Sequence, residues 1–347
     1  MRPAAKATTT ADPSPSWLRW VTRIALIAGT VGWVATVYLV GPRTIYGQLR
    51  AIGGWFAALI AVGIGMTSLD AAAVYTLTKG PGAPPYSRVF IAQLAGSAVN
   101  AVTPGGNLGE VLKASILAEQ TKGARVIGAV MYCGLSSLCI SLVMIAIGAP
   151  LTAILMDLRD GIRLAMIAGG LVAAGVVIVV VVLVKRGMLR SVIGLAGRLR
   201  LVSAKRRKKW EAKLAEIDER ISGTGDPRGR RRATLFVLLS KLLGWFSTWI
   251  IVATAGYMLD VPELAALLSA GTLLGWLSTL VPMGLGIAEG GNYGLFKLIG
   301  APASLGVSLA LAHRVLQVFA AIIGFTVLGL YRLSQRTARR KGARLRG

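Results

Sequence analysis

Two short stretches combine helix-breaking residues with a carboxylate inside apolar parts of the chain. The first reads TPGGNLGE and ends at Glu110, and the second reads VPMGLGIAE and ends at Glu289. Proline and glycine interrupt a helix, and a glutamate at the third position of the next helix closes its N-terminus. The pattern predicts two broken helices that restart with Asn107 or Gly286 as N-cap. The predicted helix-breaking residues are Pro104, Gly105, Gly106, Pro282, Gly284 and Gly286.

Each glutamate has two interpretations, which are compatible. In the first, it only caps its helix and offsets the helix dipole. In the second, it faces a wet cavity, where it contacts a lipid head group or exchanges a proton. Carboxylates within a membrane are rare, because inserting one costs about 2.5–3.5 kcal/mol on insertion scales.

Three basic side chains accompany the two motifs. Lys113 lies three residues after Glu110, where it either holds a phosphate as a point charge or pairs with that glutamate. Arg314 lies deep in the last apolar run, too far in to snorkel easily, so we expect a carboxylate or phosphate partner. His313, the only histidine, is interpreted as an interior residue, with a proton relay as the alternative.

Four other residues are given structural interpretations. Asp70 and Lys241 lie near the ends of two apolar runs, where snorkelling to the interface is the default. Cys133 and Cys139 are six residues apart on one predicted helix, too far along its axis for a disulfide. The sequence contains no His/Cys cluster with metal-ligand spacing, so we expect no metal and no cofactor.

The elements that carry these residues are long apolar helices. The chain has 347 residues, 54% of them hydrophobic, and several runs reach the roughly 18 residues that cross a bilayer as a helix. The alternation typical of a membrane barrel is absent. The sequence therefore predicts an all-α, polytopic integral membrane protein. The six predicted crossings cover residues 24–41, 55–77, 126–150, 164–184, 235–259 and 303–331.

The positive charge is concentrated in three flanking segments. Residues 1–23, 185–232 and 332–346 carry 21 of the 25 net positive charges. No nucleic-acid motif accompanies them, and this distribution is instead the positive-inside pattern of membrane proteins. All three segments, and with them both termini, are expected in the cytoplasm.

This orientation constrains the two motif-bearing segments. The number of crossings between two cytoplasmic segments must be even, so residues 89–122 begin and end in the cytoplasm. By the same count, residues 264–302 begin and end outside. The two segments are predicted to form oppositely oriented helical hairpins in pseudo-inverted halves. Parity alone leaves open whether each is re-entrant or fully spanning.

The predicted organisation has five parts. Within the basic loop, four apolar residues follow one face of a charged helix, which favours an anionic membrane surface, with a docking helix for a partner enzyme as the alternative. The basic C-terminal tail, like the N-terminal one, is expected to be disordered. The parts are a disordered tail (1–20), a first membrane half (21–184) with hairpin 87–122, a basic loop (185–233), a second half (234–331) with hairpin 262–302, and a basic tail (332–347).

Both motifs resemble the signature motifs of a known family. Pro-Gly-Gly-x-x-Gly-Glu followed by Lys113, and Pro-x-Gly-x-Gly-x-x-Glu followed by GGNYGLFKLIG, look like those of the lysylphosphatidylglycerol synthase membrane domain, the flippase-like family. Arg314 in AHRVLQVF is similar to a position of the same family, and the resemblance covers roughly residues 20–332. In bifunctional members an acyltransferase domain attaches lysine to phosphatidylglycerol and the membrane part moves the product. This chain stops at Gly347, so the resemblance implies a stand-alone translocator.

The sequence favours a flippase in the cell membrane, without enzymatic activity, that moves a phospholipid, an aminoacyl-lipid or a polyprenyl-phosphate lipid and holds its head group at the broken-helix tips. Broken helices at matching places in inverted halves indicate a transport site, and the absence of a phosphate-binding loop motif points to a gradient or to no energy source. An intramembrane lipid-modifying enzyme and a scaffold that recruits a lipid-synthesis enzyme are the alternatives. The sequence leaves open which lipid is moved, in which direction it is moved, and whether the protein forms a homo-oligomer. The expected substrate-binding residues are Glu110, Lys113, Glu289, Arg314, Asn107 and Asn292.

Overall fold

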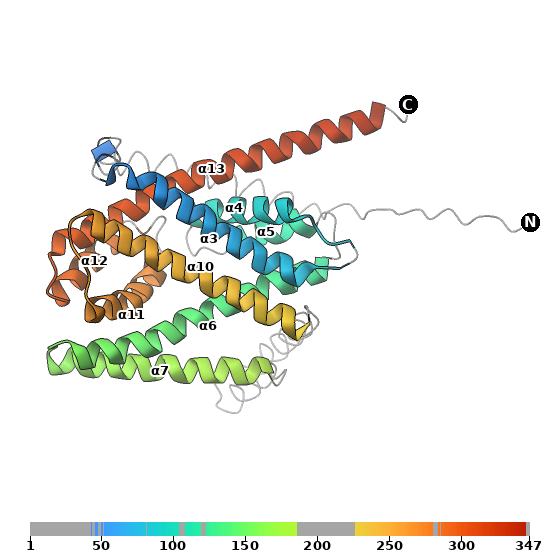
Figure 1. Ribbon diagram of the computed structural model, residues 1–347. Helices are drawn as coiled ribbons and strands as arrows, with labels where there is room; N and C mark the ends of the chain where they lie inside the picture. The colour runs from blue at the N-terminus through green and yellow to red at the C-terminus, as the bar shows by residue number, and fades with distance from the viewer. Residues whose placement is uncertain are drawn as a thin grey trace, which may run out of the picture.

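The protein is a bundle of long helices (Figure 1). The computed structural model describes residues 43, 46–47, 50, 52–80, 82–103, 108–118, 123–185, 226–279, 284 and 286–344. All regular structure among these residues is helical, which confirms the predicted fold class. The helices are α3 (Trp55–Thr78), α4 (Tyr86–Val102), α5 (Leu108–Ala118), α6 (Gly123–Leu155), α7 (Asp160–Lys185), α10 (Pro227–Thr254), α11 (Val261–Ser278), α12 (Ile287–Leu298) and α13 (Ala303–Arg344).

Six of these helices are long and apolar enough to cross a membrane, namely α3, α6, α7, α10, α11 and α13. Five coincide with predicted crossings, whereas the predicted crossing at 24–41 lies outside the described residues. The sixth, α11, is the first arm of the second predicted hairpin. Of the other hairpin helices, α4 has 17 residues. The helices α5 and α12 have 11 and 12 residues, which gives them lengths of about 16–18 Å.

Proline and aspartate set the start of two spanning helices. Asp226 caps α10 by accepting a hydrogen bond from the Gly229 backbone N–H at 2.8 Å, and Pro227 occupies the first turn. At α11, Asp260 and Glu263 form a reciprocal capping box. Both helices therefore begin before the apolar run of their sequence, because a capped N-terminus needs no apolar residue.

Two hydrophobic clusters divide the bundle into opposite ends. One joins the end of α3 and the start of α6 and α10 to both helices of the first hairpin, α4 and α5. The other joins the start of α3 and α13 and the end of α10 to both helices of the second hairpin, α11 and α12. In Figure 1 the first hairpin lies towards the right of the bundle and the second at its left. The two hairpins thus belong to opposite ends of the molecule.

The packing partners repeat between the two halves. The α4/α5 hairpin packs against α13 of the other half, and the α11/α12 hairpin against α6, while α3 and α10 pack on each other. Each cross-half contact uses a glycine. A Cβ on Gly324 of α13 would lie 2.6 Å from the Leu94 carbonyl oxygen of α4, and one on Gly148 of α6 would lie 2.9 Å from the Ala265 carbonyl oxygen of α11. Small residues let helix backbones approach closely in this way.

The structure also covers part of the predicted terminal and loop segments. Helix α13 continues without a break to Arg344, so the prediction of a disordered tail after Tyr331 is wrong as far as that residue. The reason is the absence of proline in that stretch and its content of arginine, alanine and leucine, which favour helix. The predicted N-terminal tail and the amphipathic part of the basic loop lie outside the described residues.

Gly324→Ala tests the close contact between the halves. The added methyl group would overlap Ala98 and the Leu94 carbonyl of α4, so we expect the free energy of unfolding in detergent to fall by about 1–3 kcal/mol. Gly329→Ala is the matched control, because nothing lies within 4 Å of a Cβ at that position of the same helix. An equal unfolding temperature for the two variants would contradict the contact.

The turn before α11 predicts a pH dependence. Tyr257 donates a hydrogen bond to Glu263, and this bond, with desolvation and the nearby negative charges, raises the pKa of Tyr257 to about 12. The raised pKa favours the folded state below pH of about 10, and this contribution is lost as the pH rises through 12. The difference in tyrosinate absorbance between the wild type and Tyr257→Phe should therefore show a titration with a midpoint near pH 12. A midpoint near 10 would contradict the hydrogen bond.

Candidate functional site

Helices α4 and α5 flank the first helix-breaking motif. Helix α4 ends at Val102, where the Thr103 hydroxyl donates to the Val99 carbonyl at 2.8 Å and the backbone becomes extended. Helix α5 begins at Leu108. The connecting residues Pro104, Gly105, Gly106 and Asn107 lie outside the described residues.

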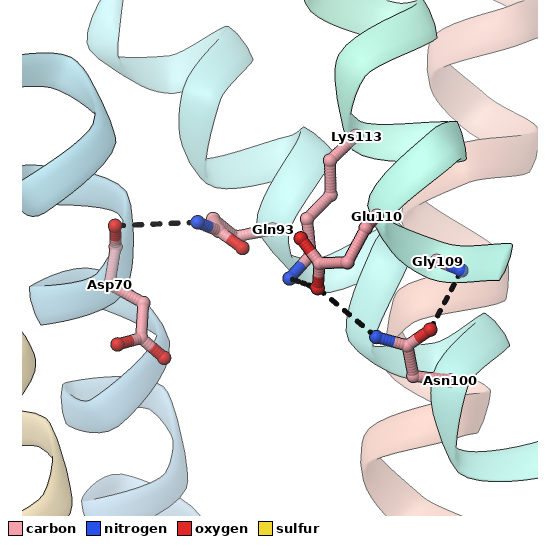
Figure 2. A network of polar contacts seen from close by, with 6 residues as sticks. All are labelled: Asp70, Gln93, Asn100, Gly109, Glu110 and Lys113. Atoms are coloured by element: carbon pink, nitrogen blue, oxygen red, sulfur yellow. Dashed lines mark hydrogen bonds and ion pairs between the residues drawn. The ribbon is translucent and has the colours of Figure 1, made fainter. Parts of the chain in front are cut away.

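A polar network joins the two helices of this hairpin (Figure 2). Lys113 donates to Glu110 Oε1 at 2.7 Å, and Asn100 of α4 donates to the same oxygen at 3.2 Å. The Asn100 side-chain oxygen in turn accepts from the Gly109 backbone N–H at 2.7 Å. Asn100 therefore satisfies a free amide in the first turn of α5 and orients the ion pair beside it. The Lys113 side chain is 12% exposed and that of Glu110 is 42% exposed.

Two glycines make this network possible. A Cβ on Gly96 of α4 would lie 2.8 Å from the Gly109 carbonyl oxygen of α5, and a Cβ on Gly109 would clash with Asn100. The backbones of α4 and α5 therefore touch at this level. Lys113 also lies against Gly96, so its aliphatic chain is confined while its ammonium group reaches Glu110.

The second hairpin turns through glycines in the left-handed region. Gly284 and Gly286 have φ of +67° and +80°, which side chains with a Cβ rarely adopt. Helix α12 starts after Gly286, whose backbone N–H donates to Glu289 Oε2 at 2.9 Å. Glu289 thus takes up an amide that lipid would leave without a partner. Pro282 lies outside the described residues.

The other oxygen of Glu289 binds Arg314 of α13. Arg314 is 4% exposed and the Glu289 side chain 23% exposed, so the guanidinium is buried beside a carboxylate that still reaches open space. The sequence analysis predicts a carboxylate or a phosphate as the partner of Arg314, and in the structure the partner is the carboxylate of Glu289. Asn292, one turn after Glu289, donates to the Ala288 carbonyl at 2.7 Å.

A cavity of about 460 Å³ lies between the two hairpin tips. Its wall includes the end of α4, most of α11 and the start of α12, together with the middle of α10 and the first half of α13. Of the predicted substrate-binding residues, Arg314 and Asn292 line it. Glu289 is bound to Arg314 at its edge, and the Glu110–Lys113 pair adjoins it through Asn100.

Lys241 corrects the sequence analysis. It was assigned to the interface, but it is the fifteenth residue of α10 and its side chain lines the cavity. The tryptophans Trp245, Trp249 and Trp276 line the same cavity, as does His313, whose Nε2 lies 3.4 Å from the Thr248 hydroxyl. The signal that locates Lys241 is the Asp226–Pro227 helix start, which places it well inside the helix.

Asp70 adds a negative charge to this region. Its carboxylate on α3 is within electrostatic reach of Lys113 and Lys241, and Gln93 of α4 donates to its backbone carbonyl at 3.3 Å. Figure 2 shows Asp70 on the helix facing the Glu110–Lys113 pair. The snorkelling interpretation of Asp70 does not describe this position, because eight further residues of α3 follow it. In the described part of the chain, no group of three His, Cys, Asp or Glu side chains can hold a metal ion.

Comparison with known proteins identifies one family. The model of the family described as the lysylphosphatidylglycerol synthase TM region matches residues 20–324. No curated protein and no solved structure matches the chain. The matched range contains both hairpins, the cavity and the Glu289–Arg314 pair.

Neutralising one partner of the Glu289–Arg314 pair should destabilise the protein. Arg314→Gln leaves the Glu289 carboxylate without its cation, and Glu289→Gln leaves a buried guanidinium, so we expect each to cost about 3–5 kcal/mol. The double variant should recover part of this loss, which a double-mutant cycle of unfolding in detergent measures. Asp157→Asn is the control, because the Asp157 carboxylate is fully exposed in its ion pair with Arg163. Additive single effects would contradict the pairing.

Proposed function

The chain belongs to the lysylphosphatidylglycerol synthase transmembrane-region family, and on that premise we propose that it moves a membrane lipid between leaflets. The lipid's polar head group enters the cavity between the hairpin tips, while its acyl chains stay in the bilayer. The two halves then rock about the cavity and expose it to each side in turn. The protein is a multi-pass membrane protein, and the cell membrane is its proposed location.

The observation that carries this proposal is a cavity with charged side chains in its wall, inside a bundle of helices long and apolar enough to span a membrane. It contains Lys241 and Arg314, and charged side chains at membrane depth are costly unless they have a function or a partner. Its volume, about 460 Å³, falls in the range of small-molecule sites. Tips from both hairpins contribute to its wall, which is the arrangement of transporters built from inverted repeats.

The charges in the cavity suit a phospholipid head group. Arg314 and Lys241 offer positive charge to its phosphate. Glu289 and Glu110, beside the cavity, would take a cationic group or a proton in exchange for their present partners Arg314 and Lys113. Arg314 already binds Glu289, so a phosphate would compete with that carboxylate and release it. Lys113 is engaged by Glu110 beside the cavity, so we assign the second phosphate contact to Lys241 in its place.

The helix lengths support re-entrant hairpins. Helices α5 and α12, with 11 and 12 residues, are about half as long as the roughly 30 Å hydrocarbon core. We infer that α5 and α12 therefore reach only to about the midplane, whereas α11, with 18 residues, is long enough to cross. Each hairpin begins and ends on one side of the membrane. The basic residues at the end of α3 and the start of α10, with the positive-inside pattern, orient the first hairpin and the tail of α13 towards the cytoplasm.

A liposome assay tests the transport proposal. Purified protein in liposomes should accelerate the movement of a head-group-labelled phospholipid to the outer leaflet, where an impermeant quencher detects it. We expect Lys241→Gln and Arg314→Gln to slow this movement at least tenfold, since each removes a charge-assisted contact to phosphate. Lys297→Gln is the matched lysine control, because that side chain is exposed at the end of α12.

The same assay separates the alternatives. A scaffold predicts that deletion of residues 205–222 abolishes function while Glu110→Gln and Arg314→Ala stay active, and transport predicts the reverse. A lipid-modifying enzyme predicts chemical turnover of the lipid by the pure protein, lost in Glu110→Gln. Failure to move any labelled phospholipid or polyprenyl phosphate would contradict the proposed function.

A further inference from the structure

A second cavity, of about 580 Å³, lies at the end of the bundle where α3 ends and α6 and α10 begin. Four basic side chains line it, namely Lys79, Arg125, Arg228 and Arg232. It shares no residue with the central cavity, so it is a separate site. Arg125 donates to the Lys79 carbonyl at 3.5 Å, which ties the start of α6 to the end of α3.

The charge of this cavity is unbalanced within the residues that line it. The one carboxylate among those residues, Asp226, caps α10 by accepting from the Gly229 N–H at 2.8 Å. Arg228 and Arg232 are four residues apart on α10 and therefore lie on one face of that helix. Two guanidinium groups on one face, with Lys79 and Arg125 opposite, provide the donor geometry that binds a phosphate.

An apolar groove of about 700 Å³ continues from these arginines along α6 and α10. It shares Arg228 and Arg232 with the basic cavity and adds Arg231. Its remaining wall is formed by Thr234 and by the apolar side chains Ile140, Leu235 and Leu238. Arg231, Leu235 and Leu238 follow one another at spacings of four and three residues, so they form a single stripe that runs from the charged end towards the membrane interior.

We propose that this end of the bundle binds one anionic phospholipid as a resident ligand. Its phosphate lies between Arg228, Arg232 and the cations opposite, and one acyl chain follows the groove along Leu235, Leu238 and Ile140. A free phosphate would use the arginines alone, whereas a lipid uses the arginines and the groove together. The basic cavity and the groove meet at the same two arginines, which is the arrangement an amphiphile requires.

This site is distinct in role from the central cavity. It is lined by the ends of α3, α6 and α10, and α10 packs on both α3 and α6. A lipid held there joins the three helices at one end of the bundle. Its binding is therefore measurable without transport, and its failure would leave the transport proposal untouched.

Native mass spectrometry of the whole protein in neutral detergent tests the proposal. The probes are dioleoylphosphatidylglycerol, dioleoylphosphatidylcholine and glycerol 3-phosphate. We expect one tightly bound phosphatidylglycerol, weaker phosphatidylcholine, and no comparable binding of glycerol 3-phosphate. The variant Arg228→Gln/Arg232→Gln should weaken phosphatidylglycerol binding at least ~10-fold, because each basic residue near a membrane surface contributes to anionic-lipid affinity. Arg159→Gln, in the turn between α6 and α7, is the control.

A second pair of variants tests the groove. Leu235→Trp fills the groove at an exposed position and should weaken phosphatidylglycerol binding without changing the unfolding temperature. Leu239→Trp is the matched control, since Leu239 is also exposed but does not line the groove. Equal binding of phosphatidylglycerol by the wild type and both arginine and groove variants would overturn the proposal. Glycerol 3-phosphate binding as tightly as the lipid would overturn it too, by assigning the site to free phosphate.

Discussion

The interruption of helices within a membrane is the constraint on which the rest of the structure depends. Each break leaves backbone amides without helical partners, and hydrocarbon offers them no hydrogen bond. The protein satisfies such amides with side chains of the hairpins themselves. Asn100 accepts from the Gly109 N–H, and Glu289 accepts from the Gly286 N–H. One of these two acceptors, Glu289, is also a charged group at the edge of the central cavity through its ion pair with Arg314.

The hydrogen bonds that satisfy the backbone amides at the two breaks have consequences for the packing of the helices. The carboxylates beside the two breaks need cations, which Lys113 supplies to Glu110 and Arg314 supplies to Glu289. The hairpins also need close neighbours, which glycines at 96, 109, 148 and 324 permit. Because the first hairpin packs on α13 and the second on α6, each half completes the other. The central cavity is bordered by the end of α4 from one hairpin and by α11 and the start of α12 from the other.

The sequence predicted the fold and the hairpins more completely than the site. Apolar length and basic flanks were enough for the helices, because lipid imposes both rules on every span. Lys241 was misplaced because the apolar run begins at Leu235, whereas the helix begins at Pro227 under an Asp226 cap. Arg314 was recognised as needing a partner, but only the packing of α12 on α13 brings Glu289 to it. Pairs formed between distant helices follow from tertiary contacts that no local pattern encodes.

Opposite entry of the two hairpins is the central claim, and thiol labelling tests it most directly. Ser87 and Ser304 are exposed residues at the starts of α4 and α13. Each is replaced by cysteine in a background in which Cys133 and Cys139 are serine. An impermeant maleimide added to intact cells should label Ser304→Cys, and Ser87→Cys only after permeabilisation. Labelling of both from the same side of the membrane would contradict the account.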